Sequence, residues 1–401
     1  MKTNSWILLH FCVFILLQIT CSQDPLTWKN IDCGTEAPRV GPNFLTWEMD
    51  HDFTPSGINK RLPENQPLDE MTTLRFFPNR MDQNCYTIPA YKQNLQYIIR
   101  AGFYYGNYDG LSKPPTFDLY LDGQKWSTVS TSTIGGPIYV EAIHWTHGSG
   151  SIGLCLIQTR NGEVPFISSL EAMPLWTHLY LQMETNSTFT LLNRTNLGGN
   201  EIRYTGLLSD EKYNRIWTSG SIPPNCKKVS TLPDSTTPTL QNDPPKLVLQ
   251  DSITSNTSDP IILTVDSPLN WTSQTAYLVL YFTETATRPT IDDTRIMDIE
   301  IDGRMMYTVG TEINQCKVVT LYPVPLVGPT TNIKLAPSRL STLPPIITAI
   351  EAFTRVNIDV HNDPPPPSSA ASGDNSTSGA WKRFCVPYIV FIYISSAIFM
   401  F

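Results

Sequence analysis

An internal repeat constrains the fold of this chain more than any other feature of its sequence. Segments recur in the same order, each offset by about 180 residues, and a period of this length is typical of tandem domains rather than of a solenoid. The similar segments are Tyr97–Tyr105 with Tyr277–Phe282, Phe117–Gly123 with Met297–Gly303, and Phe166–Ala172 with Ile346–Ala352. We therefore expect two copies of one module, the first over residues 28–181 and the second over residues 185–359.

The repeated segments have the sequence pattern of β-strands. Gln96–Tyr105 is apolar and aromatic, whereas Phe117–Leu121 and Ile152–Ile157 alternate between apolar and other residues, as a strand with one buried face does. The repeated alternating runs end in Asp122-Gly123 and Asp302-Gly303, dipeptides that favour a tight hairpin turn. Because long amphipathic helices are hard to find, the pattern predicts an all-β fold in which each module is a β-sandwich.

Residues 1–22 are predicted to be a secretory signal peptide. Lys2 supplies the positive charge, Trp6–Ile19 the apolar stretch and Thr20–Ser22 a cleavage zone. Behind them lie five sequons, the acceptor pattern for N-glycosylation, and sequons behind an export signal predict a glycoprotein. The sequon asparagines are Asn186, Asn193, Asn256, Asn270 and Asn375.

The C-terminal part is predicted to be a stalk followed by a GPI-attachment signal. Residues 360–383 form a Pro/Ser-rich stalk, and its proline run is extended enough to hold the folded part away from a membrane. Small residues, a polar spacer and the apolar tail 384–401 favour GPI anchoring, with Ser372 or Gly373 as the attachment residue. The alternative is a single membrane-spanning anchor. In both cases the secretory pathway would deliver the folded part to the extracellular face of the plasma membrane.

Processing at these sites would leave five of the eight cysteines in the mature chain. Export permits disulfides, and an odd number leaves at least one thiol unpaired. We expect disulfides between Cys33 and Cys85 and between Cys226 and Cys316. Cys155 lies within the apolar run Leu154-Cys155-Leu156, where a free cysteine can serve as a small hydrophobic residue.

A polar, aromatic loop after the first repeated strand is the strongest candidate for a binding site. Sugars stack on aromatic rings, and their hydroxyl groups donate hydrogen bonds to Asp and Asn side chains. The second copy has TETATRPTID at this place, so the prediction is confined to the first copy. The alternative is that the tyrosines pack the end of the sandwich and cap a turn. The candidate carbohydrate-binding residues are Tyr104, Tyr105, Asn107, Tyr108 and Asp109.

The remaining motifs favour structural roles. Gly148–Gly153 matches GxGxxG, but a strand-like run follows it instead of a helix, so we expect a turn and no dinucleotide cofactor. His144 and His147 lie three apart on a predicted strand and face opposite sides, so no metal site is expected. Glu171 and Glu351 recur at equivalent positions, which suggests a structural role. The net charge of -8 is spread along the chain without a basic cluster, and nucleic-acid binding is not expected.

Ordered sequence blocks resemble the malectin-like extracellular domain of plant receptor-like kinases. The resemblance covers nearly the whole mature chain, and several blocks in the right order are more specific than any single block. These blocks are Ile31–Gly34, Asn84–Tyr86, Tyr104–Gly110, Phe117–Tyr120, Pro165–Glu171, Tyr213–Trp217, Pro244–Lys246 and Leu343–Ile347. The resemblance implies two malectin modules, each a lectin-like β-sandwich.

The resemblance also implies a role in recognition. Animal malectin binds a glucose-terminated N-glycan through an aromatic pair whose place Tyr104 and Tyr105 occupy. Plant relatives perceive cell-wall polymers or secreted peptides, often with GPI-anchored or receptor partners. The receptors' leucine-rich repeats, spanning helix and kinase are not found in this sequence. We therefore expect a non-enzymatic protein that binds a cell-wall or N-glycan carbohydrate, or that acts as a co-receptor for a receptor kinase and a secreted peptide.

Two other functions stay open at this point. A secreted β-sandwich carbohydrate-active enzyme would need paired carboxylates across a cleft. A purely structural wall protein would use the tandem modules only to space its partners.

Overall fold

The computed structural model describes residues 28–356, apart from residues 42–43, 64–67, 79–83, 91–93, 147–149, 176–178, 204–210, 232–240, 268–273, 286–287 and 314. The predicted signal peptide, stalk and tail lie outside the described residues, as do Asn270, Asn375, Ser372, Gly373 and His147. The described elements are β-strands and two short 3-10 helices, η2 (Asp69–Met71) and η3 (Val248–Gln250), so the predicted all-β fold is confirmed. In this part of the chain no helix is long and apolar enough to cross a membrane.

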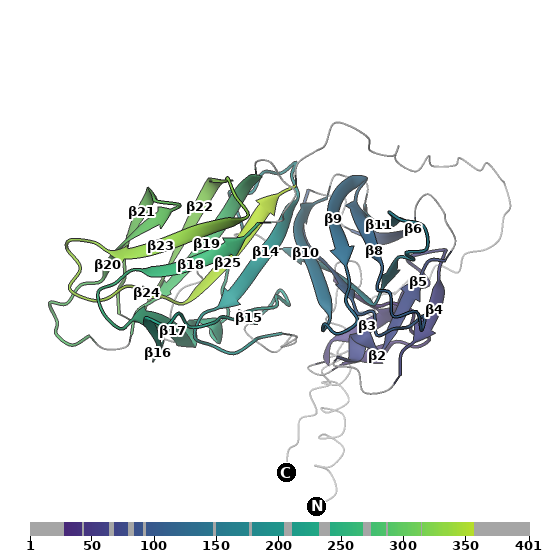
Figure 1. Cartoon of the computed structure of the whole chain (residues 1–401), viewed down its shortest axis with the longest axis horizontal. Helices are drawn as coiled ribbons and strands as arrows, with labels where there is room; N and C mark the ends of the chain where they lie inside the picture. The colour runs from purple at the N-terminus through teal and green to yellow at the C-terminus, as the bar shows by residue number, and fades with distance from the viewer. Residues whose placement is uncertain are drawn as a thin grey trace, which may run out of the picture. The chain divides into compact units, whose positions relative to one another are not determined.

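One sheet of eleven strands runs through both copies of the repeat (Figure 1). From edge to edge it contains β2 (Arg39–Val40), β3 (Thr46–Met49), β1 (Lys29–Asp32), β13 (Ser169–Leu175), β7 (Gln96–Phe103), β10 (Ile138–Trp145), β14 (Phe189–Asn196), β25 (Ala349–Arg355), β19 (Gln274–Thr283) and β22 (Cys316–Leu326), while β15 (Thr218–Ser219) pairs with β14. We call β1–β13 the N-terminal half and β14–β25 the C-terminal half. The halves join where β10 pairs with β14, through Ala142 opposite Thr190 and Ile143 opposite Phe189.

Each half adds one four-stranded and one three-stranded sheet. The four-stranded sheets are β6 (Asn84–Pro89), β11 (Ser151–Gln158), β8 (Thr116–Leu121) and β9 (Gln124–Ser130) in one half, and β18 (Ile261–Asp266), β23 (Thr330–Pro337), β20 (Ile296–Ile301) and β21 (Arg304–Gly310) in the other. The three-stranded sheets are β12 (Phe166–Ile167), β5 (Thr73–Phe76) and β4 (Ile58–Arg61), and then β24 (Ile346–Ile347), β17 (Asp251–Ser255) and β16 (Cys226–Ser230). The strand orders of the two halves correspond sheet by sheet.

Both predicted Asp-Gly hairpin turns are confirmed. Asp122 and Gly123 join β8 to β9 with φ of 47° and 81°, and Asp302 and Gly303 join β20 to β21 with the same two values. Two consecutive residues with positive φ match the right-handed twist of the flanking strands, and Asp-Gly is one of the few dipeptides that allow this conformation. Each aspartate side chain also accepts a hydrogen bond from a backbone N–H of the neighbouring strand. Asp122 accepts from Gly153 at 2.6 Å, and Asp302 accepts from Asn332 at 2.8 Å.

The apolar runs of β7 and β19 are explained by burial on both faces. In β7, Ile99 and Phe103 belong to the core of the N-terminal half, whereas Ile98 belongs to a separate junction core. In β19, Leu280 belongs to the core of the C-terminal half, and Tyr281 to the junction core. A strand that is buried on both faces needs apolar residues at successive positions. The junction core therefore contains side chains from both halves.

The predicted disulfide pairing is wrong. Cys85 is bonded to Cys155, and Cys33, Cys226 and Cys316 are free and buried. The physical reason is register, because Cys85 and Cys155 stand directly opposite each other where β6 pairs with β11. The alternation of β11 also gives Cys155 a face different from that of its apolar neighbours.

Candidate functional site

The loops that follow β7 and β19 leave the eleven-stranded sheet at the same end of its strands. We call this end of the strands the loop edge. β7 pairs antiparallel with β10, β10 with β14, β14 with β25, and β25 with β19. Four antiparallel steps restore the original direction, so β7 and β19 run the same way. The N-terminal loop (residues 104–115) and the C-terminal loop (residues 284–295) thus occupy equivalent places. The N-terminal loop carries the predicted binding residues.

Tyr105 ties the N-terminal loop together through its hydroxyl group. The side chain is buried, and its hydroxyl donates to Asp109 Oδ1 at 2.6 Å. The hydroxyl oxygen of Tyr105 also accepts from the backbone N–H of Lys113 at 3.1 Å. Burial, followed by the hydrogen bond to Asp109, raises the pKa of Tyr105 to about 12, so the hydroxyl keeps its proton for this bond.

Tyr108 fills the space beneath the same loop. The residue is 8% exposed, and its ring centroid lies 5.3 Å from that of Phe76 and 5.3 Å from that of Phe166. A third ring, Tyr105, lies 5.7 Å away in an edge-to-face arrangement. Such pairs add to the stability that burial alone provides. Tyr108 is therefore part of the packed floor of the loop.

Asn107 and Asp109 cap the turn in which they stand. Asn107 adopts a φ of 53°, and its Oδ1 accepts from the N–H of Ser112 at 2.8 Å. Asp109 Oδ1 accepts from the N–H of Leu111 at 3.0 Å. Short polar side chains favour turns because they bond to nearby backbone in this way. Both residues remain exposed on their outer side.

The five predicted residues are gathered in one loop, but they do not face the same way. Tyr105 and Tyr108 bury their rings, so neither offers a face on which a sugar could stack in this conformation. Tyr104 is half-buried at the margin of the N-terminal core. The expected aromatic platform is thus reduced to the ring of Tyr104, with Asn107 and Asp109 exposed nearby in the chain.

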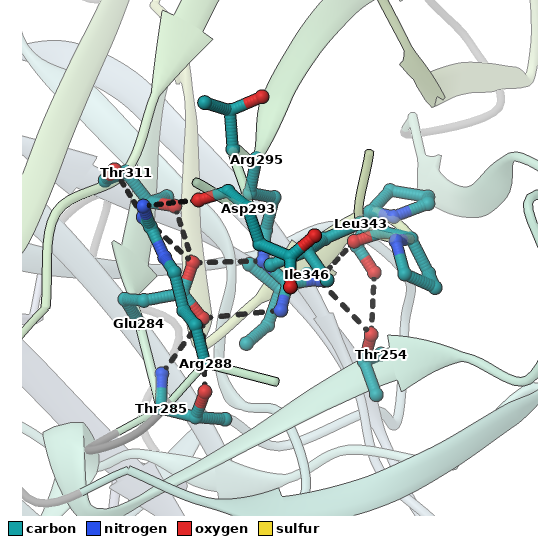
Figure 2. Close-up of polar contacts among 12 residues, drawn as sticks. Thr254, Glu284, Thr285, Arg288, Asp293, Arg295, Thr311, Leu343 and Ile346 are labelled. Carbon is teal, nitrogen blue, oxygen red and sulfur yellow. Dashed lines mark hydrogen bonds and ion pairs between the residues drawn. The ribbon is translucent and has the colours of Figure 1, made fainter. Parts of the chain in front are cut away.

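The C-terminal loop is closed by ion pairs instead of aromatic rings (Figure 2). Glu284 is fully buried and accepts from Arg295 Nε at 2.9 Å, from Arg288 Nη2 at 3.3 Å and from Thr311 Oγ1 at 2.7 Å. Burial acts to raise the pKa of this carboxyl group, but the bonds from Arg295 and Thr311 outweigh it and lower the pKa to about 2. Glu284 is therefore ionised at neutral pH and anchors the loop.

Arg288 and Asp293 connect the C-terminal loop to its neighbours. Arg288 donates to the carbonyl of Asp293 at 2.8 Å and to that of Thr311 at 2.7 Å (Figure 2). Asp293 Oδ1 accepts from Thr342 Oγ1 at 2.9 Å, and Thr294 Oγ1 donates to the carbonyl of Leu340 at 2.8 Å. The described residues of the three loops that follow β19, β21 and β23 are thereby bonded into one unit.

Exposed aliphatic side chains stand on the loops at this edge in both halves. In the C-terminal half Ile291 is 97% exposed and Leu340 is 75% exposed. In the N-terminal half Leu111 is 63% exposed and Ile134 is 97% exposed. Single exposed apolar residues are common on protein surfaces. Leu111 and Ile291 stand on the equivalent loops that follow β7 and β19, whereas Ile134 follows β9 and Leu340 follows β23. Their presence on loops of both halves, which are themselves held by hydrogen bonds, makes this edge the candidate contact surface.

A buried chain of alternating charges crosses the junction between the halves. Arg100 pairs with Glu141 and with Glu171, each at 2.9 Å. Arg194 pairs with Glu141 at 2.8 Å and with Glu351 at 2.6 Å. All five side chains are buried. Burial opposes the charge of Glu141, but Arg194 and Arg100 outweigh it and lower the pKa of that carboxyl group.

The segment Tyr213–Trp217 packs against this network. Asn214 Nδ2 donates to Glu171 at 2.8 Å, and Trp217 Nε1 donates to the buried Glu211 at 3.0 Å. The resemblance marked this segment as a family block without giving it a physical role. The structure gives it one, because it supplies further hydrogen-bond donors to the buried carboxylates of Glu171 and Glu211.

The other motifs have structural surroundings. His144 is buried, with Nε2 at 2.8 Å from Asp122 and Nδ1 at 2.8 Å from Thr188. Gly153 lies within strand β11, so the GxGxxG motif runs into a strand, as predicted. Over the described ranges, no group of three or more His, Cys, Asp or Glu residues is placed to hold a metal ion.

The described sequons differ in accessibility. Asn186 and Asn256 are exposed in turns, where a glycan could extend into solvent. Asn193 lies within β14 and is half-buried, and its Oδ1 is enclosed without a hydrogen-bond partner. We therefore regard Asn186 and Asn256 as the stronger glycosylation candidates.

Comparison with known sequences identifies relatives over most of the chain. A family model described as the malectin-like domain matches residues 31–355. The chain is 29% identical over 375 residues to the probable leucine-rich-repeat receptor-like serine/threonine-protein kinase MEE39 of Arabidopsis thaliana, covering 88% of this chain and 40% of that protein. It is 31% identical over 349 residues to the probable leucine-rich-repeat receptor-like kinase At2g28990 of the same plant, covering 83% and 37%. The chain thus spans about 40% of the length of these relatives.

Solved structures with the same fold are receptor ectodomains. The ANX2 ectodomain of Arabidopsis thaliana aligns with a TM-score of 0.69 at 14% identity, covering 83% of this chain and 97% of that one. The crystal structure of the plant peptide RALF23 in complex with FER and LLG2 aligns with a TM-score of 0.62 at 15% identity, covering 83% and 96%. At such low identity these structures establish likeness of fold alone.

Proposed function

The chain belongs to the malectin-like domain family, and on this basis we propose that it is a non-enzymatic recognition protein of the cell surface. In this proposal it binds a secreted peptide or a receptor protein as a co-receptor. The observation that carries the proposal is the edge where loops of both halves, fixed by internal hydrogen bonds, present exposed aliphatic side chains. Protein interfaces use such apolar anchors on preorganised backbone.

The proposal includes two tandem malectin-like modules, over residues 28–181 and 185–359. It is supported by the matching strand orders of the halves and by the two Asp-Gly hairpins with the same φ values. The modules would share one sheet, so the loops of both would hold a fixed relation to each other.

The class of partner is proposed by analogy with a structural neighbour. FER has been crystallised with the peptide RALF23 and a second protein, LLG2. A peptide or protein ligand also suits the described loops, whose large exposed apolar side chains are aliphatic rather than aromatic.

Carbohydrate binding is the second candidate function. It is favoured by the half-buried ring of Tyr104 and by the exposed side chains of Asn107 and Asp109 in the same loop. A sugar would have to use Tyr104 alone for stacking, because Tyr105 and Tyr108 are packed inward. A wall or N-glycan ligand is therefore the weaker of the two proposals.

The proposed absence of catalysis rests on the state of the buried carboxylates. Glu141, Glu171 and Glu351 are each paired with an arginine and buried in the sheet junction. A glycosidase needs a carboxylate pair that faces the scissile bond, with one acid protonated. These three side chains cannot meet a substrate without dismantling the sheet.

We expect the loop edge to be required for partner binding. The double variant Ile291→Asp/Leu340→Asp should weaken binding of the native partner at least tenfold, because loss of an apolar anchor costs about 2 kcal/mol or more. The measurement is the amount of partner that co-purifies with the soluble head, residues 23–363, from plant plasma membranes. Val327→Asp is the matched control, because Val327 is 85% exposed in the turn between β22 and β23, at the opposite edge. Equal loss with the control, or no loss with the double variant, would reject the loop edge as the contact surface.

The proposed GPI anchor can be tested separately. Treatment of intact membranes with a phosphatidylinositol-specific phospholipase should release the protein, because the small-residue spacer and apolar tail are the signal for lipid attachment at Ser372 or Gly373. A Ser372→Trp/Gly373→Trp variant should lose surface display, because bulky residues are excluded from the attachment site. Retention of the wild-type protein on the membrane after treatment favours a spanning tail instead.

A further inference from the structure

The disulfide lies on the outer face of a four-stranded sheet. Cys85 and Cys155 face each other across β6 and β11, while their neighbours Tyr86 and Leu154 are fully buried in the core. Successive side chains of a strand point to opposite faces, so both sulfur atoms lie on the side away from the core. The two cysteines are half-buried, in contrast to Cys33 and the other free thiols, which are buried.

The equivalent pair of strands in the C-terminal half has no disulfide at this position. In the N-terminal half, Cys155 of β11 stands opposite Tyr120 of β8. At the equivalent place in the C-terminal half, Lys334 of β23 stands opposite Glu300 of β20. The partner of Lys334 on the outer strand is Ile262, where the N-terminal half has Cys85. The same strand order forms in that half without a covalent bond at this position. The bond is therefore an addition to a fold that does not require it.

We propose that Cys85–Cys155 is a redox-sensitive switch that a dithiol reductant opens in the folded protein. A thiolate of the reductant attacks one sulfur, the S–S bond breaks, and a mixed disulfide forms. The second thiol of the reductant then displaces the protein sulfur, so that the reductant leaves as a disulfide and two electrons pass to the protein. Each released cysteine thiolate takes up one proton. Exchange requires access of a thiolate to a sulfur atom, and these two half-buried sulfur atoms on the outer face are more accessible than the buried thiols.

Opening the disulfide should act on β6 and on the contacts that β6 makes. Six residue pairs hold β6 to β11 independently of the sulfur atoms, so the strand stays in the sheet. On the inner face Tyr86 donates to Asp50 at 2.9 Å, and Arg75 holds the same carboxylate at 2.6 and 2.7 Å. Because β6 is the outermost strand of its sheet, loss of the cross-link should increase its mobility and that of this polar corner.

The experiment measures thiol exposure and local opening together. The mature glycoprotein is titrated with dithiothreitol under native conditions, and free thiols are alkylated and located by mass spectrometry. Cys85 and Cys155 should be modified first, at reductant levels that leave the circular dichroism unchanged, while Cys33 stays protected. Amide hydrogen exchange in residues 84–89 should rise at least tenfold, with little change in β19.

Two variants distinguish the switch from general unfolding. Cys85→Ser/Cys155→Ser should show the fast exchange of β6 without reductant and should not respond to dithiothreitol. Cys33→Ser keeps the disulfide and should respond as the wild type does. The proposal is overturned if the disulfide is reduced only where Cys33, Cys226 and Cys316 also react, or if reduction leaves the exchange of β6 unchanged.

Discussion

Replacing Arg194 with alanine should lower the free energy of unfolding by about 3–5 kcal/mol. Arg194 is fully buried and holds Glu141 of the N-terminal half and Glu351 of the C-terminal half at 2.8 and 2.6 Å. Removing it deprives the buried Glu351 of this ion-pair partner and leaves Glu141 with Arg100 alone. An unpaired buried charge costs more than the pair contributes, so the loss should far exceed that of an ordinary surface substitution.

The measurement is equilibrium unfolding of the soluble head in denaturant, read as a shift of the midpoint at constant slope. Lys125→Ala provides the matched control. Lys125 also pairs with a carboxylate, Asp118 at 2.7 Å, but its side chain is 45% exposed. Exposed ion pairs are worth about 0–1 kcal/mol, so this variant should unfold almost as the wild type does. A loss below 1 kcal/mol for Arg194→Ala would show that the junction network does not hold the halves together.

Replacing Glu284 with alanine should destabilise the C-terminal half by about 3 kcal/mol, because it leaves the guanidinium groups of Arg288 and Arg295 without their carboxylate. The loop unit of Figure 2 should loosen as well, since both arginines bridge neighbouring loops through backbone carbonyls. Hydrogen exchange in residues 288–295 and 311–313 measures the second effect. Asp298→Ala is the control, because Asp298 bonds Thr308 at 2.7 Å in an exposed setting on the same half.

The same carboxylate should give the C-terminal half a distinct pH dependence. The pKa of Glu284 falls from 4.5 to about 2 on folding, so its contribution to stability is present above pH 4.5. That contribution should be lost as the pH falls toward 2. The difference in unfolding midpoint between the wild type and Glu284→Gln should therefore shrink between pH 4.5 and pH 2. A difference that stays constant over this range would contradict the assigned ion pairing.

The repeat made much of the fold predictable from the sequence. Alternation identified the strands, and the recurring Asp-Gly dipeptides identified both hairpins. Arg100 carried a further signal, because an arginine inside the apolar run Tyr97–Phe103 must find a buried anion. The identity of that anion could not be predicted, since Glu141 and Glu171 reach Arg100 only through the order of strands in the sheet.

The disulfide pairing and the conformation of the N-terminal loop could not be predicted from the sequence. Cys155 was expected to be a free, small hydrophobic residue within an apolar run, and only the register of β6 against β11 shows that Cys85 stands opposite it. In the loop, the residue types suited both a sugar site and a capped turn. Which way Tyr105 and Tyr108 point depends on aromatic partners from distant segments, among them Phe76 and Phe166. No local pattern specifies such long-range packing.

The most direct test of the proposed function compares protein and sugar binding by one preparation. The soluble head, residues 23–363, is applied to an array of wall glycans and N-glycans and, in parallel, to plasma-membrane extracts that contain receptor kinases and secreted peptides. We predict capture of a receptor protein or peptide that Ile291→Asp/Leu340→Asp abolishes and Tyr104→Ala leaves intact, with no glycan bound. Glycan binding that Tyr104→Ala removes, without any captured receptor or peptide, would contradict the co-receptor proposal.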